Sequence, residues 1–411
     1  MANATFVIEI GFTASRVDVT ADVTGINIKT GRQRVIDSFH AGTCKISLNN
    51  SSGKYTPLGD GTYSNSQFIG TEVRVLVTLN SASVPTCLFR GKIEDANAIF
   101  TNKYESLVEL TCSDGFADLA RTELNAVSFS SHVGSTRFTS VLDNASVDYP
   151  DEPGSPAANT PKNRDVNTSS ITMASETVNT TNTLSYLKRL ANSEDGMIFI
   201  RHGMKGGGSV TAGDKGNILT YTKRDQAPDS TGLTFGPSSA TTATPPMISV
   251  KTSYGAELLF TKGVYQRNGG SDQAVTDTAG KAAYGLRTII RRSLLNNNDS
   301  DVLGACENFV YRHAAPSLRV EGIVCRPEAM TEAQAEKVAK ISIADGISVN
   351  FTPAGASGAI TRSLRVEGVT HRITPKNWHM TINTSGVGET NYLLLDSTAV
   401  GLLNENRLAP G

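Results

Sequence analysis

The first 125 residues alternate between apolar and polar positions with a period of two. The alternation is clearest at 17–23, 44–48, 73–77 and 107–112. Successive side chains of a β-strand point to opposite faces, so this period predicts strands that are buried on one side. Clusters of Gly, Asn and Ser between the segments supply turns. The pattern predicts an all-β domain over residues 1–125, a barrel or a sandwich, with Ile46 and Leu48 in its core.

The composition changes over residues 126–180, where Ser, Thr, Asn and Pro dominate. Proline cannot continue a regular helix or a central strand, and the short polar residues favour turns. We therefore expect a polar, loop-rich insertion over 126–180. One or two helical turns are expected around 137–142 because apolar residues recur there.

A helix and a hairpin are predicted next. Three leucines fall on one stripe after Asn182 or Thr183, and both residue types are favourable N-caps. Two apolar segments, 197–200 and 218–221, flank a Gly-rich connection and predict a hairpin with a long loop. Residues 181–270 are therefore expected to form an α+β middle domain.

Helical periodicity returns over residues 271–345. Val302, Ala305 and Phe309 recur at a spacing close to 3.6 residues, which predicts a helix with Phe309 in a core. A second helix is predicted at 332–340, where a Thr and a Gln have the spacing of a capping box. We expect a helix-containing domain in this part of the chain.

The stretch LRVEGVTHRITPKNWHMTIN predicts a β-hairpin near the end of the chain. A turn at 374–377 would place Ile373 opposite Trp378 and leave Met380 on the same apolar face. We expect these three residues in the core, with Trp378 as its anchor. The two histidines of the stretch would then point to opposite faces and could not share a metal ion. Residues 346–385 are predicted to be β-hairpins that complete a second β domain, followed by a C-terminal tail over 386–411.

Charge and cysteine content argue against several classes of function. Lys and Arg number 38 against 39 Asp and Glu, so the net charge of -1 does not favour a surface that grips nucleic acid or an anionic membrane. The sequence has no run of 18 apolar residues and no signal-peptide pattern, so we expect no membrane anchor and synthesis in a cytoplasm. Five cysteines without a C-x-x-C pair predict free thiols rather than disulfides or a metal site.

The remaining motifs have plain structural interpretations. The Gly-rich segment 203–215 lacks the Lys and the Ser or Thr of a phosphate loop, so a hairpin tip is favoured. The acidic and amide cluster 296–301 precedes a helix and is interpreted as its cap rather than a calcium loop. Arg291 and Arg292, with two nearby basic residues, predict a solvated face or a subunit contact. No catalytic residue, cofactor site or metal site is predicted.

The order of these segments resembles minor tail proteins of tailed bacteriophages, of the tail-tip or baseplate hub class. The residues that carry the resemblance include GTEVRVLV, VELTCSDGFADLAR, LSYLKRLANSEDGMIFI and LRVEGVTHRITPKNWHMTIN. The resemblance spans roughly residues 15–385 and depends on the ordered series rather than on any single fragment. It implies a mainly β fold with two small antiparallel β-barrel domains and inserted α+β domains. The sequence departs from the commonest version of the family in the polar segment 146–170.

The resemblance also implies a function and partners. Three chains with two related barrels each would form a pseudo-sixfold ring, which can seat against a hexameric tail tube. The implied partners are further copies of the chain, a distal tail protein or tail tube ring, a tape measure protein and tail fibre or tip proteins. Such a protein would reside in the virion after assembly in the host cytoplasm. Phage DNA would pass its channel without specific binding, which agrees with the neutral charge balance.

Two other functions remain open from the sequence. The first alternative is a receptor- or glycan-binding β module at the tail tip, which would need exposed aromatic residues beside amides and carboxylates. The second is an enzyme such as a peptidoglycan hydrolase, for which no catalytic constellation emerges.

The LRVEG sequence at 364–368 also occurs at 318–322, and we interpret the two copies as similar strands.

Overall fold

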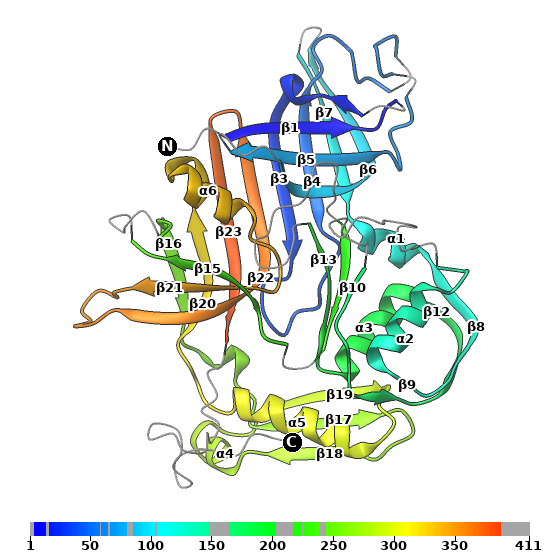
Figure 1. Cartoon of the computed structure of the whole chain (residues 1–411), viewed down its shortest axis with the longest axis vertical. Helices are drawn as coiled ribbons and strands as arrows, with labels where there is room; N and C mark the ends of the chain where they lie inside the picture. Colours follow the sequence, from blue (N-terminus) through cyan, green and yellow to red (C-terminus); the bar gives the residue numbers. More distant parts are fainter. Residues whose placement is uncertain are drawn as a thin grey trace.

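One continuous sheet joins the two ends of the chain (Figure 1). The computed structural model describes residues 4–13, 16–57, 59–64, 66–79, 85–102, 105–147, 149, 164–202, 217–223, 226–237 and 244–387. Within this part of the chain, the sheet has 13 strands. In spatial order, eleven of them are β16 (Ser249–Ser253), β20 (Arg319–Cys325), β23 (Asn377–Gly386), β22 (Ile360–Thr374), β3 (Val23–Gly31), β4 (Thr43–Asn49), β7 (Glu105–Ser113), β6 (Thr86–Asn102), β5 (Glu72–Leu79), β1 (Ala4–Ile10) and β2 (Val17–Asp18). The other two are β21 (Asp345–Phe351), which pairs with the first half of β22, and β15 (Asp229–Phe235), which pairs with β21.

The sheet contains the same strand order twice. The first half-sheet has the order β3-β4-β7-β6-β5-β1, and the second has the order β16-β20-β23-β22-β21-β15. If the six strands of each half-sheet are numbered in chain order, both half-sheets have the spatial order 2-3-6-5-4-1. The last pair differs, because β1 is antiparallel to β5 whereas β15 is parallel to β21. The two half-sheets meet where β22 pairs with β3, and we call this pairing the seam.

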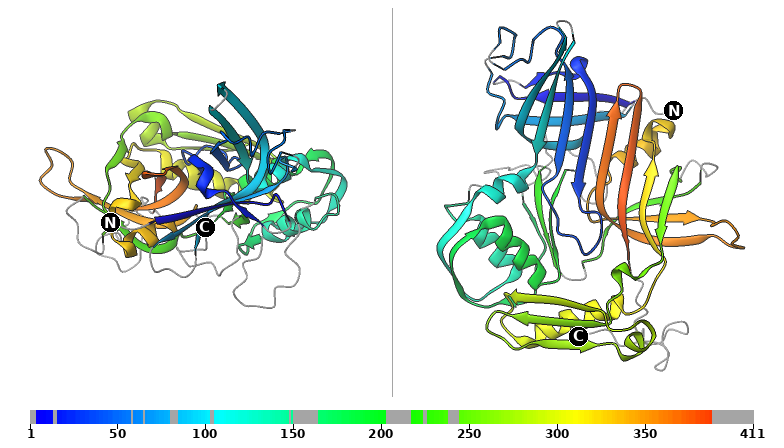
Figure 2. Two further views of the ribbon diagram at one scale, coloured as in Figure 1. Left: turned by 90° about the horizontal axis from the view of Figure 1, so that it is seen from above. Right: turned by 180° about the vertical axis from the view of Figure 1, so that it is seen from behind.

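The predicted fold class is confirmed: the chain is mainly β with an α+β middle, and its two β parts have the same topology. The β parts are not separate closed barrels, because the seam makes them two curled halves of one sheet (Figure 2). They share one hydrophobic core, which includes the expected residues Ile46, Leu48, Ile373, Trp378 and Met380. Each of these is at most 4% exposed.

The hairpin of β22 and β23 has the predicted register. Ile373 lies opposite Trp378, His371 opposite Met380, and Arg372 opposite His379. The turn is fixed by the Thr374 hydroxyl, which accepts a hydrogen bond from the backbone N–H of Asn377 at 3.2 Å. His371 is buried and His379 is exposed, so the two imidazoles lie on opposite faces as predicted.

A second core forms from the segment between the two half-sheets. Its helices are α1 (Gly115–Arg121), α2 (Gly134–Leu142) and α3 (Thr183–Ser193). Its strands are β8 (Glu123–Phe129) with β12 (Glu176–Asn182), β9 (His132–Val133) with β11 (Thr172–Met173), and β10 (Arg164–Val166), β14 (Ile218–Thr222) and β13 (Met197–Arg201) in that spatial order. Helix α3 begins after Asn182, whose side chain accepts a hydrogen bond from the backbone N–H of Ser185 at 3.0 Å.

The sequence expects loops over 126–180, but the described part of this segment contains strands. β12 pairs with β8 over most of its length, although its residues are mainly Thr, Asn and Glu. Composition predicted a loop because the Asn, Ser and Pro residues of this segment favour turns, and the pairing of β12 with β8 outweighs that preference. The hairpin of β13 and β14 is confirmed by its antiparallel register.

Three segments named in the sequence analysis lie wholly or mostly outside the described residues: 203–215, 146–170 and the C-terminal tail.

A third core is inserted between β16 and β20. Helix α5 (Asp299–His313) packs on a sheet of β18 (Gln273–Thr276), β17 (Lys262–Arg267) and β19 (Thr288–Leu294), with α4 (Thr278–Tyr284) nearby (Figure 1). Phe309 of α5 is 6% exposed and lies 6.3 Å from the ring of Tyr265. The cap of α5 is Asn298, a member of the cluster 296–301 that the sequence assigns to the cap, and its side chain accepts from the N–H of Asp301 at 2.8 Å.

Helix α6 (Glu332–Ala339) follows β20 and covers the second half-sheet. The predicted capping box is present, because Thr331 and Gln334 exchange side-chain and backbone hydrogen bonds. Three short 3₁₀ segments complete the described secondary structure: η1 (Thr20–Asp22), η3 (Ala256–Leu258) and η4 (Pro327–Ala329). The exact limits of the domains along the chain stay a prediction.

Candidate functional site

The seam holds the two half-sheets together through backbone and side-chain contacts. β22 runs antiparallel to β3 from Gly368 opposite Gly31 to Ile373 opposite Ile26. Gly31 has a φ of +82°, and a Cβ atom there would lie 2.3 Å from the carbonyl oxygen of Glu367. Any larger residue would therefore force the two strands apart.

An ion pair closes one end of the seam. The guanidinium Nε of Arg32 lies 2.7 Å from Glu367 Oε2, and the backbone N–H of Arg32 donates to the Glu367 carbonyl at 2.9 Å. The Glu367 side chain is 1% exposed and also accepts from the Ser385 hydroxyl at 2.6 Å. The Arg32 guanidinium lies 4.4 Å from the centre of the Phe39 ring. A buried charge of this kind is tolerated only when it is paired and hydrogen-bonded.

Trp378 is packed beside the seam. Its indole N–H donates to His371 Nδ1 at 3.2 Å, and its ring meets Phe6 edge-on at 5.2 Å. His371 lies opposite Ile28 of β3, so the indole contacts a residue that belongs to the seam itself. With 1% exposure, Trp378 cannot offer a face to a ligand.

Two buried histidines share a small cavity next to the seam. His202 and His371 both line it, together with Cys87 and Lys340. Burial lowers the pKa of His371 to about 4, and burial together with the nearby His371 lowers the pKa of His202 to about 3. Both imidazoles are therefore neutral at neutral pH.

Asp114 lies beside these histidines, with Oδ2 3.8 Å from His202 Nε2. Its carboxylate caps α1 by accepting from the N–H of Phe116 at 3.1 Å, and it accepts from the N–H of Gly42 at 2.7 Å. Burial nevertheless raises the pKa of Asp114 to about 7. A buried carboxyl beside a neutral imidazole links the second core to the sheet by hydrogen bonds and packing.

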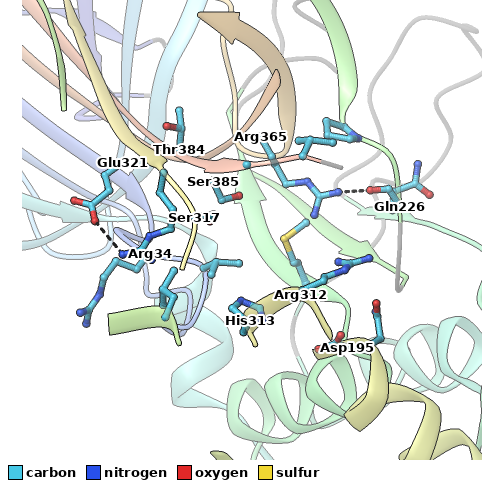
Figure 3. Close-up of a pocket in the computed structure, with 18 of the residues that line it drawn as sticks. Arg34, Asp195, Gln226, Arg312, His313, Ser317, Glu321, Arg365, Thr384 and Ser385 are labelled. Atoms are coloured by element: carbon cyan, nitrogen blue, oxygen red, sulfur yellow. Dashed lines mark hydrogen bonds and ion pairs between the residues drawn. The ribbon is translucent and has the colours of Figure 1, made fainter. Parts of the chain in front are cut away.

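A cleft of about 620 Å³ opens where the sheet, the second core and the third core meet (Figure 3). Its lining includes Arg312 and His313 of α5, Arg319 and Glu321 of β20, and Arg365 of β22. Each of these elements belongs to a different part of the chain, so the cleft exists only in the folded protein. It is far larger than the small cavity beside the seam.

The carboxylates of the cleft are paired with basic residues. Three carboxylates line it, and each has a basic partner: Asp195 with Arg291, Glu257 with Arg34, and Glu321 with Lys251. Arg365 donates to the backbone carbonyl of Gln226 (Figure 3). Each of these carboxylates therefore belongs to an ion pair that links two segments of the fold, and this arrangement favours a structural role.

His313 is the histidine of the cleft. Burial lowers the pKa of its imidazole, and Nδ1 lies 2.8 Å from the Phe309 carbonyl oxygen. That contact requires a proton on Nδ1, which leaves Nε2 as an acceptor. The ring stacks on Phe309 at 4.2 Å, which fixes its orientation.

Arg291 and Arg292 do not lie on one surface in the structure. Arg291 is directed inward, where it pairs with Asp195 at 2.7 Å and lies 5.0 Å from the ring centre of Tyr265. Arg292 is directed outward and pairs with Asp272 at 2.9 Å. Consecutive residues of a strand point to opposite faces, so two adjacent arginines cannot share one surface.

Metal and membrane sites were also tested on the described part of the chain. It holds no group of three or more His, Cys, Asp or Glu residues arranged to bind a metal ion. None of the helices described is both long and apolar enough to span a membrane. All five cysteines are buried and free, as the sequence predicts.

Sequence reasoning missed the seam and the cleft. Arg32 and Glu367 are separated by 335 positions along the chain, and neither belongs to a recognisable motif. The repeated LRVEG at 364–368 contains Glu367, so the echo was a partial signal for it. Nothing in the local pattern around 312–321 or 365 indicates that these segments meet.

The comparisons with known proteins concern the fold. No family model matches the sequence, and no curated protein sequence matches it. A tail protein from Neisseria meningitidis aligns with a TM-score of 0.57 at 8% identity, over 94% of this chain and 97% of that chain. A prophage 43 kDa tail protein from Shewanella oneidensis aligns with a TM-score of 0.57 at 11% identity, over 93% of this chain and 97% of that chain. The chain therefore has the fold of bacteriophage tail proteins, as its sequence resemblance predicts.

Proposed function

We propose that this chain is a structural protein of the virion: the hub of a bacteriophage tail tip or baseplate. In this role a homotrimer adapts the hexameric tail tube to threefold tip components and forms part of the DNA exit channel. The observation that carries the proposal is the repeated half-sheet within one chain. Three chains with two equivalent half-sheets each would offer six similar surfaces to a sixfold neighbour.

The partners follow from this placement. The ring would contact the tail tube or a distal tail protein on its sixfold side and fibre or tip proteins on its threefold side, with the tape measure protein nearby. The net charge of -1 supports a channel that passes DNA without binding it, since each phosphate contact would slow its exit. We place the chain in the virion after assembly in the host cytoplasm.

The alternative, a receptor- or glycan-binding module, gains little support. Sugar rings stack on exposed aromatic faces, but Trp378 is 1% exposed, and the exposed rings of Phe100, Tyr254 and Tyr284 do not line the cleft. A catalytic role gains little either, because the carboxylates that line the cleft are ion-paired. The proposed role therefore consists of assembly contacts.

The mass of the purified protein tests the trimer. Sedimentation velocity over a range of concentrations should give three times the chain mass of 43.6 kDa, and negative-stain images should show a ring with six lobes. A single-chain mass at every concentration, with tail tube protein present or absent, would overturn the hub. Gel-shift titration with duplex DNA at low salt should show no saturable binding, and tight binding would contradict the channel.

A further inference from the structure

Among the described strands, the outer half of β6 has a neighbour on one side alone. Residues 86–92 of β6 pair with β5, but residues 94–102 pair only with β7 among the described strands. The equivalent strand of the second half-sheet is β22. Its first half pairs with β21, and its second half pairs with β3 across the seam. The outer half of β6 is thus an edge where its counterpart is paired.

A shared bulge fixes the correspondence between β6 and β22. The register shifts between Ile93 and Asp95 in β6, and between Val366 and Gly368 in β22. The extra residue is Glu94 in one case and Glu367 in the other. The Glu94 side chain accepts from the Ser113 hydroxyl as Glu367 accepts from the hydroxyl of Ser385. Counting from the bulge, Phe100 of β6 is therefore equivalent to Ile373 of β22.

The residues of β6 are more exposed than their equivalents in β22. Phe100 is 64% exposed, whereas Ile373 is 4% exposed because β3 lies against it. Ala96 and Ala98 are half-buried, whereas Val369 and His371 at the equivalent positions are buried. A large apolar side chain at an unpaired strand edge is a feature that monomeric proteins avoid.

A matching free edge lies on β16, the first strand in the spatial order of the sheet. β16 pairs only with β20 among the described strands, and it is the counterpart of β3 in the strand order (Figure 1). Val250 of β16 pairs with Ile323 as Ile26 of β3 pairs with Ile46. Val250 is half-buried and packs on the rim of the main core. β16 is therefore equivalent to the strand that completes β22 at the seam.

We propose that residues 97–100 of β6 in one chain pair antiparallel with residues 250–253 of β16 in a second copy of this chain. The pairing repeats the seam between molecules and places Phe100 opposite Val250, as Ile373 lies opposite Ile26. The two edges are different surfaces of the chain, so the contact is head-to-tail and closes into a ring when the rotation permits. The inference deepens the proposed function and rests on it for the number of chains in the ring.

Cysteine cross-linking tests the register. In the double variant Phe100→Cys and Val250→Cys, oxidation should join neighbouring chains into a covalent ring that runs as a trimer on a non-reducing gel. The matched control is Phe100→Cys with Lys251→Cys, whose side chains would point to opposite faces and should not cross-link. The native cysteines are buried and leave a low background.

A charge at the same position provides the second measurement. Phe100→Lys should reduce the sedimenting mass from trimer to single chain with an unchanged circular dichroism spectrum. Ile99→Lys, on the other face of the same strand, should leave the trimer intact because the equivalent Arg372 stays exposed at the seam. A wild-type trimer that resists Phe100→Lys and gives no Phe100–Val250 cross-link would overturn this pairing while leaving the hub in place. A wild-type protein that remains a single chain would overturn both.

Discussion

Replacing Arg32 by Ala should weaken the sheet more than removing an exposed ion pair of the same kind. Glu367 is 1% exposed, and Arg32 supplies its positive charge at 2.7 Å. Removing one partner of a buried pair leaves the other charge uncompensated, which costs about 3–5 kcal/mol. We expect the free energy of unfolding to fall by that amount in Arg32→Ala.

Arg16 offers a matched control. Its guanidinium lies 2.6 Å from Glu72, so the contact is as close, but the side chains are 37% and 28% exposed. Exposed pairs contribute about 0–1 kcal/mol, because water screens the charges and both side chains lose conformational freedom. Arg16→Ala should therefore cost less than about 1 kcal/mol.

Urea unfolding followed by tryptophan fluorescence is the appropriate assay. Trp378 is the sole tryptophan, and its indole bonds to His371 of the seam, so the signal reports on the region that is perturbed. In the double variant Arg32→Ala with Glu367→Gln, part of the lost stability should return because no buried charge remains unpaired. Equal losses in Arg32→Ala and Arg16→Ala would refute the role assigned to burial.

Three further predictions concern buried groups. Trp378→Ala should lower the free energy of unfolding by about 3–5 kcal/mol, and Trp378→Phe by less because its ring keeps most of the packing, as measured by circular dichroism in urea. His371 and His202 have pKa values of about 4 and 3 in the folded protein, against an ordinary 6.5. The unfolded chain therefore binds protons more readily than the folded protein, so the free energy of unfolding is highest above pH 6.5 and decreases as the pH falls towards 4. Asp114 has a folded pKa of about 7 against 3.8 and opposes this loss, so urea midpoints at several pH values should fall more steeply in Asp114→Asn than in the wild type. Finally, burial raises the pKa of the Cys112 thiol to about 12 and of the Cys306 thiol to about 11, so a thiol reagent should modify none of the five cysteines in the native protein and all five in urea; rapid native labelling would contradict the buried placement.

The local pattern of the sequence determined which residues face inward, the register of the last hairpin and where two of the helices begin. Alternation placed Ile46, Leu48 and Trp378 on inward faces, and the turn at 374–377 fixed the register of the last hairpin. Capping residues located α3 and α6 because a cap acts on N–H groups within three positions. Composition failed over β12, where pairing with β8 stabilises a polar strand that composition assigns to a loop.

Only the tertiary structure decided how the half-sheets relate. The two Glu–Ser pairs at the bulges are equivalent, yet Glu94 and Glu367 lie in sequences too different to align by residue identity. The seam depends on Gly31 and Arg32 meeting Glu367, and the cleft depends on α5, β20 and β22 meeting. A one-dimensional pattern reports which face of an element is buried. It does not report which partner buries it, because apolar faces attract one another without regard to distance along the chain.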